Sequence, residues 1–314
     1  MSLPFLTQAL APLTFLVEAV NEFGDPLEVS IPCERALTVY VDKRELVTLM
    51  TLGAHPELLV LGFLRNQRLI ESVSDVESIT VDWEVGAAAV KTRNGIVDIE
   101  AKTAKRVVTT GCGQGSVFGD LMHNVDSIVL PEARLTQSQL YGIVNAIRLQ
   151  ESTYKSAGSV HGCALFSGEE MLVFIEDVGR HNALDTIAGW MWMQDSAPTL
   201  GTDVSSLPPE GALFPLGRPG GESVAPTLAV MSGADKVFYT TGRLTSEMVI
   251  KSAQMGVPIV VSRSGITQMG FEVAERLGLC TIGRATNKHF LCFSGAHRLV
   301  LQPELAGTRL RAVA

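Results

Sequence analysis

The chain has 314 residues, of which 46% are hydrophobic and 18% are charged, and its formal net charge is -8. This composition predicts a globular protein with a large core, and the acidic charge argues against general electrostatic binding to DNA or RNA. No apolar run approaches the roughly 20 residues that span a bilayer, and the N-terminus lacks the basic segment of a secretory signal. We therefore expect a cytoplasmic protein that binds neither nucleic acid nor a membrane.

The first part of the chain, residues 1–110, is predicted to form a smaller, strand-rich N-terminal domain. Short β-like runs alternate there with polar turns. The clearest of these runs cover residues 37–41, 78–81 and 95–100. One helix is expected at residues 56–65, with Leu58, Leu59 and Leu61 facing inward.

Residues 111–130 are predicted to be a glycine- and cysteine-containing loop followed by a connection. In this loop Cys112 stands between Gly111 and Gly113, which leaves its sulfur open and its backbone free to move. A thiol that accepts and passes on a sulfur atom needs both properties, together with a lowered pKa. A structural or incidental role for this cysteine is the alternative.

Residues 131–314 alternate between helical and strand patterns, which predicts an α/β domain. Thr136 and Gln139 form a capping box before a run of apolar residues at helical spacing. Further helices are expected at residues 183–193, at 245–255 with Gly256 as the cap, and before Gly278. Strands are expected at residues 171–175, 237–241, 258–262, 279–282 and 290–293. This alternation implies a largely parallel or mixed sheet that is covered on both faces.

A long inserted loop is expected at residues 194–226, where proline, glycine and serine dominate the composition. The prolines forbid a long helix or a central strand there. Such a loop serves as a lid, as an interface or simply as a mobile segment.

Four arginines come directly after four of the predicted strands. They are Arg180, Arg243, Arg263 and Arg284. Ligands of open α/β sheets bind beyond the carboxyl ends of the strands, so these guanidinium groups are expected to share one rim and to bind a phosphorylated ligand. The alternative for each arginine is a structural ion pair with a neighbouring carboxylate, such as Asp177 or Glu247.

The histidines and the other cysteines give weaker indications. His181 lies between a predicted strand and a predicted helix, which favours ligand contact or proton transfer, whereas His161 fits either a site or the core. Surface or capping positions are expected for His55, His123 and His297. Core positions are expected for Cys163, Cys280 and Cys292, while Cys33 gives no signal. The wide spacing of the five cysteines is typical of reduced thiols.

Two patterns resemble known sites but lack necessary parts. Residues 111–115 are similar to a dinucleotide-binding loop, but the glycine spacing differs and the following segment is too short for a crossover helix. His55 and Glu57 form the H-x-E of zinc deaminases, but the chain has no P-C-x-x-C partner. No zinc site or other metal site is therefore expected.

Residues 176–185, which read EDVGRHNALD, and the stretches at 241–248 and 261–264 resemble the FdhD family of formate dehydrogenase maturation factors. The resemblance covers roughly residues 30–190 and 228–296. It implies a sulfurtransferase that takes persulfide sulfur from a cysteine desulfurase and sulfurates the Mo-bis(molybdopterin guanine dinucleotide) cofactor of formate dehydrogenase. It also implies a homodimer whose larger domain is a cytidine-deaminase-like, three-layer α/β domain without zinc.

The same resemblance assigns the site residues. The family's sulfur carrier is the first cysteine of a C-x-x-C loop, which falls on Cys112. The family's cofactor-binding stretch falls on Arg284, Ala285, Thr286, Asn287, Lys288 and His289. Gly115 occupies the position of the second cysteine, so no disulfide can form within this loop. This departure keeps open the alternative of a delivery chaperone that binds the cofactor without sulfur transfer. A nicotinamide-dependent oxidoreductase would rest only on the glycine loop.

Overall fold

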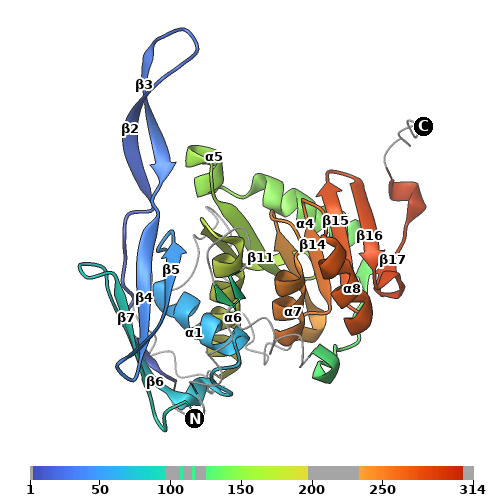
Figure 1. The fold of residues 1–314 in the computed structure, drawn as a ribbon. Helices are drawn as coiled ribbons and strands as arrows, with labels where there is room; N and C mark the ends of the chain where they lie inside the picture. Colours follow the sequence, from blue (N-terminus) through green and yellow to red (C-terminus); the bar gives the residue numbers. More distant parts are fainter. Residues whose placement is uncertain are drawn as a thin grey trace, which may run out of the picture.

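The computed structural model describes residues 3–96, 99, 107–108, 115–116, 125–196 and 233–306, with 107–108 and 115–116 as backbone only. Two large sheets make up most of the molecule, and the helices α1 (Pro56–Asn66) and α6 (Arg180–Ser196) lie between them (Figure 1). In the part of the chain that is described, no helix has both the length and the apolar character needed to cross a bilayer.

The N-terminal sheet has five strands in the order β1 (Phe5–Leu6), β6 (Val76–Asp82), β7 (Ala87–Thr92), β4 (Arg35–Val41) and β5 (Arg44–Thr51). Alternate residues of β4 are buried, as expected for a strand with one face on the core. These side chains form a hydrophobic cluster with Leu59, Leu61 and Leu64 of α1. The helix predicted at 56–65 and the strands predicted at 37–41 and 78–81 are thereby confirmed.

The strand predicted at 95–100 is wrong for the residues of this range that the structure describes. Gly95 and Ile96 lie outside any strand, and the preceding strand, β7, ends at Thr92. Asp42 fixes the end of β7, because its carboxylate accepts hydrogen bonds from the Thr92 amide at 2.9 Å and from the Thr92 hydroxyl at 2.6 Å.

A separate two-stranded ribbon, β2 (Thr14–Val20) with β3 (Pro26–Pro32), projects away from the two sheets (Figure 1). We refer to residues 14–32 as the β2–β3 arm. At its base, β3 contacts the short helix α5 (Thr153–Ala157).

The second sheet has six strands in the order β12 (Glu170–Asp177), β11 (His161–Ser167), β13 (Lys236–Thr240), β14 (Ile259–Ser262), β15 (Cys280–Thr286) and β16 (His289–Ser294). β13, β14 and β15 are parallel, whereas β11, β12 and β16 join by antiparallel pairing. The predicted mixed sheet is therefore confirmed.

Helices cover both faces of this sheet. One face packs against α6, α7 (Ser246–Gln254) and α8 (Gln268–Leu277), through strand residues such as Leu165, Phe238 and Val260. The other face, including Phe166 and Tyr239, packs against α4 (Gln137–Leu149). Short strands complete the fold, as β10 (Leu135–Thr136) pairs with β17 (Leu299–Val300) and β8 (Val107–Val108) with β9 (Gly115–Ser116).

Local signals in the sequence set the helix ends. The capping box of Thr136 and Gln139 begins α4, and Gly278 ends α8 in the left-handed conformation with φ 64°. α6 begins at Arg180, three residues before the predicted start, and extends to Ser196. The loop predicted at 194–226 therefore starts inside this helix, and its residues from 197 lie outside the described part.

Two glycines allow α1 and α6 to cross closely. A Cβ on Gly62 would lie 1.7 Å from the Asp185 carbonyl oxygen, and a Cβ on Gly189 would lie 2.1 Å from the Leu58 carbonyl oxygen. Real Cβ atoms cannot approach backbone so closely, so the contact between the helices requires glycine at both positions.

Candidate functional site

The carboxyl ends of four strands lie at one edge of the six-stranded sheet. β12 and β13 are both antiparallel to β11, so β12 runs in the same direction as β13, β14 and β15. The four arginines of the predicted rim, Arg180, Arg243, Arg263 and Arg284, all lie at this edge. The topology places all four positions at this edge, with Arg284 inside β15 rather than after it, but the four side chains do not share one environment.

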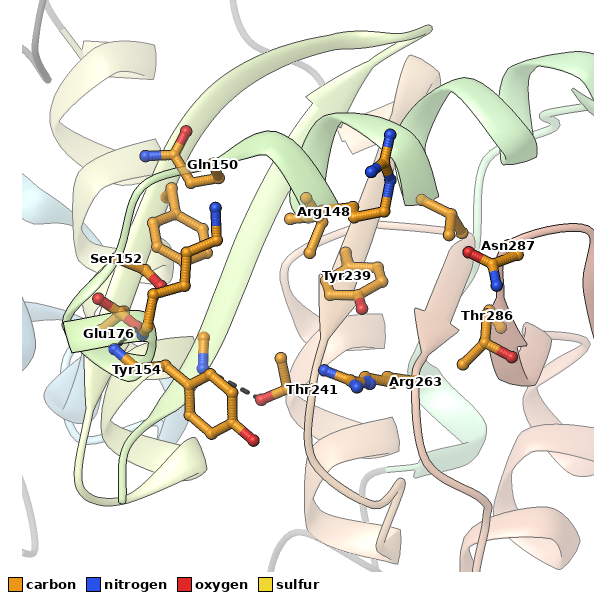
Figure 2. Close-up of a pocket in the computed structure, with 16 residues that line it drawn as sticks. Arg148, Gln150, Ser152, Tyr154, Glu176, Tyr239, Thr241, Arg263, Thr286 and Asn287 are labelled. Atoms are coloured by element: carbon orange, nitrogen blue, oxygen red, sulfur yellow. Dashed lines mark hydrogen bonds between the residues drawn. The ribbon is translucent and has the colours of Figure 1, made fainter. Parts of the chain in front are cut away.

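A pocket of about 290 Å³ opens at this edge, between the end of α4, α5 and the ends of the strands (Figure 2). Its polar lining consists of Arg148, Gln150, Ser152, Tyr154, Lys155, Glu176, Thr241, Arg263, Thr286 and Asn287. Its apolar surface comes mainly from Val144, Ile147, Phe174 and the ring of Tyr239.

The pocket lining has an excess of positive charge. Arg148, Lys155 and Arg263 are cationic, and Glu176 is the one carboxylate among the lining residues. The Glu176 carboxylate accepts the Thr153 amide at 2.5 Å and the Tyr154 amide at 3.1 Å, so it caps the first turn of α5. Its charge is therefore engaged by the helix that it positions.

The Tyr239 hydroxyl stays neutral in this pocket. Burial raises its pKa to about 12, and nearby Arg263 only partly opposes the shift. Figure 2 shows the Tyr239 ring and the Arg263 side chain between the residues of α5 and the turn with Thr286 and Asn287. Because Tyr239 is only 2% exposed, its ring forms part of the apolar wall of the pocket, while Arg263 supplies positive charge.

Half of the cofactor-binding stretch that the family resemblance implies lines this pocket. Ala285, Thr286 and Asn287 do so. Arg284, Lys288 and His289 are exposed and lie outside the lining, and the Lys288 carbonyl accepts the Tyr141 hydroxyl at 3.0 Å.

The other predicted site residues lie elsewhere. Of the four arginines, only Arg263 lines the pocket; Arg243 is exposed at the same edge and Arg180 is 4% exposed. Cys112, the predicted sulfur carrier, lies outside the described residues; in the sequence it falls between β8 and β9. His123 also lies outside the described residues.

His181 lies in the first turn of α6 rather than in a loop, and it is buried beside other charged groups. Its Nε2 is 3.5 Å from Oε2 of Glu247, whose Oε1 is 3.1 Å from Nζ of Lys251. Lys251 also pairs with Asp185 at 2.8 Å, and Asp185 accepts a hydrogen bond from the Asn66 amide at 2.7 Å. This buried charge cluster connects α1, α6 and α7.

The electrostatics of the cluster favour a neutral histidine. Burial lowers the pKa of His181 to about 4, and the attraction of Glu247 only partly offsets this effect. Burial also opposes the charge of Lys251, but Asp185 and Glu247 outweigh it and raise the pKa of this lysine. The cluster therefore holds a charged lysine between two carboxylates and an uncharged imidazole beside them.

Other polar residues of the stretch 176–185 join the two sheets. Asp177 accepts hydrogen bonds from the Thr51 hydroxyl at 2.5 Å and from the Leu52 amide at 3.0 Å. Asn182 donates to the Met50 carbonyl at 2.6 Å and to Asp177 at 2.8 Å. In the structure, this motif therefore has a structural role that its sequence did not indicate.

His161 lies close enough to both Arg180 and Arg243 to feel their positive charges. Burial lowers the pKa of His161, and both arginines lower it further. The Cys163 thiol is held in its unreactive protonated form, because burial raises its pKa to about 12. Cys163 and Cys280 are core residues as predicted, Cys292 is half-buried, and His55 and His297 are exposed.

Sequence patterns did not reveal the pocket residues contributed by α4 and α5, above all Arg148 and Lys155. The polar stretch at 148–155, between the capping-box helix and the apolar run from residue 162, was the available signal. Among the described residues, no three His, Cys, Asp or Glu side chains are grouped closely enough to hold a metal ion.

A family model described as the FdhD/NarQ family matches residues 32–206 and 225–300 of the chain. The sulfur carrier protein FdhD of Listeria innocua is 27% identical over 277 residues, which are 87% of this chain and 92% of the relative. The protein of the same name from Halalkalibacterium halodurans is 29% identical over 260 residues, which are 82% and 83% of the two chains.

A crystal structure of a formate dehydrogenase accessory protein from Desulfotalea psychrophila has the same fold. Its TM-score is 0.65 at 20% identity, and the match covers 92% of this chain and 100% of the other. At this identity the likeness concerns the fold alone.

Proposed function

The chain belongs to the FdhD/NarQ family, and from this premise we propose that it is a sulfurtransferase that carries persulfide sulfur on Cys112. The donor is a cysteine desulfurase, and the acceptor is the Mo-bis(molybdopterin guanine dinucleotide) cofactor that a formate dehydrogenase needs. The relatives' shared name, sulfur carrier protein, supports the sulfur-carrying part of this function. The pocket at the carboxyl edge supports the cofactor-binding part.

The charge of the pocket is the observation that carries the cofactor-binding part. Arg148, Lys155 and Arg263 line a pocket whose one carboxylate already caps α5. Lys155 also pairs with Glu151 at 3.3 Å, so Arg148 and Arg263 supply most of the local positive charge in a chain with a net charge of -8. Guanidinium and ammonium groups suit the phosphates of a nucleotide, and the half-buried ring of Phe174 suits its flat base.

The size of the pocket suits one end of the cofactor. Pockets for small ligands have volumes of roughly 300–1,000 Å³, and this pocket has about 290 Å³. This volume lies at the lower end of that range, so the proposal places one guanine nucleotide moiety in the pocket and the rest of the cofactor outside it. Arg263, Thr286 and Asn287 are the residues proposed to contact that moiety.

The sulfur-loading step is a thiol exchange. The Cys112 thiolate attacks the outer sulfur of the desulfurase persulfide, a new S–S bond forms on Cys112, and the desulfurase cysteine leaves as a thiolate. The outer sulfur on Cys112 is then the atom passed to the cofactor. Because Gly115 replaces the second cysteine of the loop, a single thiol carries the sulfur.

The absence of that second cysteine also favours one other function, a delivery chaperone that binds and hands over the cofactor without sulfur chemistry. Both functions use the same pocket, and they differ in whether Cys112 carries sulfur.

The cytidine-deaminase-like fold, the homodimer and the cytoplasmic location implied by the family belong to the proposal as well. The helix–sheet–helix layering around β11 to β16 supports the first of these.

The deciding experiment incubates the purified chain with a cysteine desulfurase and cysteine, and measures intact and peptide masses. The wild type should gain one sulfur atom on Cys112, and Cys112→Ala should gain none and should fail to mature formate dehydrogenase. Cys33→Ala, which removes another free thiol, is the control and should load normally. Normal maturation by Cys112→Ala would rule out the sulfurtransferase and leave the chaperone.

A further inference from the structure

One face of the β2–β3 arm consists entirely of apolar side chains. In the antiparallel register, Phe15 lies opposite Ile31, Val17 opposite Val29, and Ala19 opposite Leu27. Residues directly opposite each other, and residues two apart on one strand, share a face of the ribbon. The other face is mixed: Leu16 and Val20 are exposed there, but Glu18 lies opposite Glu28, and these like charges favour contact with water. The arm therefore has one face suited to burial.

Three of the six residues of that apolar face are exposed, and Val17, Ala19 and Val29 are half-buried. Phe15 is 63% exposed, Leu27 is 47% exposed and Ile31 is 40% exposed, while Phe23 at the tip is 80% exposed. A two-stranded ribbon is only marginally stable in water by itself. A contiguous exposed apolar patch of this kind marks an interaction site.

The charge of the arm indicates the chemistry of its partner. Between Thr14 and Pro32 the sequence has four carboxylates and no lysine, arginine or histidine. A second copy paired arm to arm would bring an equally acidic surface, and an anionic membrane would also repel the arm. The complementary surface is an apolar groove rimmed by lysine and arginine on a different protein.

The base of the arm lies beside the pocket. α5 contacts β3, and Tyr154 and Lys155 of the same helix line the pocket. Figure 1 shows α5 next to the point where the arm leaves the sheets. A protein bound along the arm is therefore within reach of the ligand that the pocket holds.

We propose that the β2–β3 arm docks the client, the cofactor-free formate dehydrogenase, while the cofactor passes from the pocket to it. This role rests on the proposed function, because that function supplies the ligand and the client. The apolar face provides the buried contact, and Glu18, Glu22, Asp25 and Glu28 provide the attraction to a basic rim.

Binding of the purified full-length chain to purified cofactor-free formate dehydrogenase, measured by biolayer interferometry, tests this role. Phe15→Ser should weaken binding by roughly tenfold or more, because buried aromatic anchors dominate interface energies. Phe23→Ser at the tip should do the same, and it lies outside the paired strands, so the ribbon stays folded. Leu16→Ser is the matched control, since Leu16 is 59% exposed but lies on the opposite face, and it should change binding by less than about twofold.

Salt and charge variants test the electrostatic part. Wild-type binding should weaken as the salt concentration rises, and Glu22→Lys should weaken it at low salt. Unchanged binding by both serine variants at Phe15 and Phe23, or no binding of the wild type to the apoenzyme, would overturn the proposal. Light scattering measures the oligomeric state of the same variants. If Phe15→Ser converted a dimer to a monomer, the apolar face would belong to an interface with a second copy, and the docking proposal would be overturned as well.

Persulfide loading of Cys112 by a cysteine desulfurase is measured on the same variants and should remain at the wild-type level. A loading defect confined to the Phe15 and Phe23 variants would assign the arm to the sulfur donor instead of the client. Failure of the wild type itself to load would count against the sulfurtransferase, and the binding result on the arm would still stand.

Discussion

Arg263 and Arg243 both lie at the carboxyl edge of the six-stranded sheet, but only Arg263 lines the pocket. If the pocket holds a guanine nucleotide moiety, Arg263→Lys should weaken GDP binding by roughly tenfold, because an ammonium cannot form the paired contacts of a guanidinium fork. Arg243→Lys is the matched control and should bind GDP like the wild type. Calorimetric titration at two salt concentrations measures the GDP affinity of the wild type and of both lysine variants. The wild-type affinity should fall as salt rises.

The outcome that would contradict this assignment is equal binding by the wild type and Arg263→Lys, or a larger loss for Arg243→Lys. Titration with NAD checks the nucleotide preference, since NAD lacks the guanine edge and should bind more weakly. Equal binding of NAD and GDP would show that the pocket attracts phosphates through its positive charge but does not select guanine.

His181 makes the stability of the fold depend on pH. Its pKa is about 4 in the folded chain, against an ordinary value of 6.5, so between these values the unfolded chain binds more protons. Stability is thus fully present above about pH 6.5 and is lost as the pH falls towards 4, by roughly 2 kcal/mol between pH 7 and pH 5. Urea unfolding at the two pH values should show this loss in the wild type.

His181→Gln provides the comparison, because glutamine does not titrate. The same pH change should cost the variant roughly 2 kcal/mol less than it costs the wild type. An identical loss in both proteins would mean that other groups carry the pH dependence. Since His181 is buried next to Glu247, this result would also require another account of the charge cluster.

At the scale of secondary-structure elements, the closest contact is the crossing of α1 and α6. Gly62→Ala would place a Cβ 1.7 Å from the Asp185 carbonyl oxygen and 2.7 Å from the Gly189 amide nitrogen. The two backbones would have to separate, so we expect a loss of about 3 kcal/mol or more in the free energy of unfolding. Chemical denaturation followed by circular dichroism measures it.

Gly265→Ala is the control for the Gly62 variant. A Cβ at Gly265 would meet nothing within 4 Å, so its effect on stability should stay within about 0.5 kcal/mol. A Gly62→Ala protein as stable as this control would show that the helices can move apart without loss of packing.

Elements with strong local signals could be predicted from the sequence. α4 has its capping box, α8 has its terminal glycine, and α1 has an apolar face behind an initial proline. β7 was missed, because its run of three alanines has little strand preference of its own. It is a strand because β4 and β6 pair with it from both sides, which is tertiary information.

The candidate site could be predicted only in part for the same reason. The edge at which the four arginines lie follows from the order of strands and helices, but their side chains do not form the one rim that we expected, because only Arg263 lines the pocket. Which arginine enters the pocket depends on how α4 and α5 pack over the strand ends, and no local pattern reports that. The hydrogen bond between Asp177 and Thr51 joins residues 126 positions apart. No local sequence pattern could therefore reveal that Asp177 connects the two sheets.

For the molecule as a whole, buried hydrogen bonds add specific connections to the packing of α1 against α6 between the two sheets. Thr51 and Leu52 donate to Asp177, and Asn66 donates to Asp185. Buried hydrogen-bonding groups are costly to separate, because each would lose its partner before water could replace it. The two sheets are thus expected to unfold together, even though each has its own hydrophobic cluster.

Amide hydrogen exchange can test this cooperativity across both sheets at once. In the wild type, the most protected amides of β4 and of β13 should exchange with the same free energy of opening. Asp177→Ala removes the acceptor for the Thr51 hydroxyl, the Leu52 and Gly179 amides and the Asn182 side chain, so it should lower protection by several kcal/mol, and by the same amount in both strands. Lys91→Ala is the control, since it removes an exposed ion pair with Glu77 and should change protection by less than about 1 kcal/mol. If Asp177→Ala lowered protection in β4 alone, the N-terminal sheet would be an independently folding unit, as its predicted status as a separate domain requires.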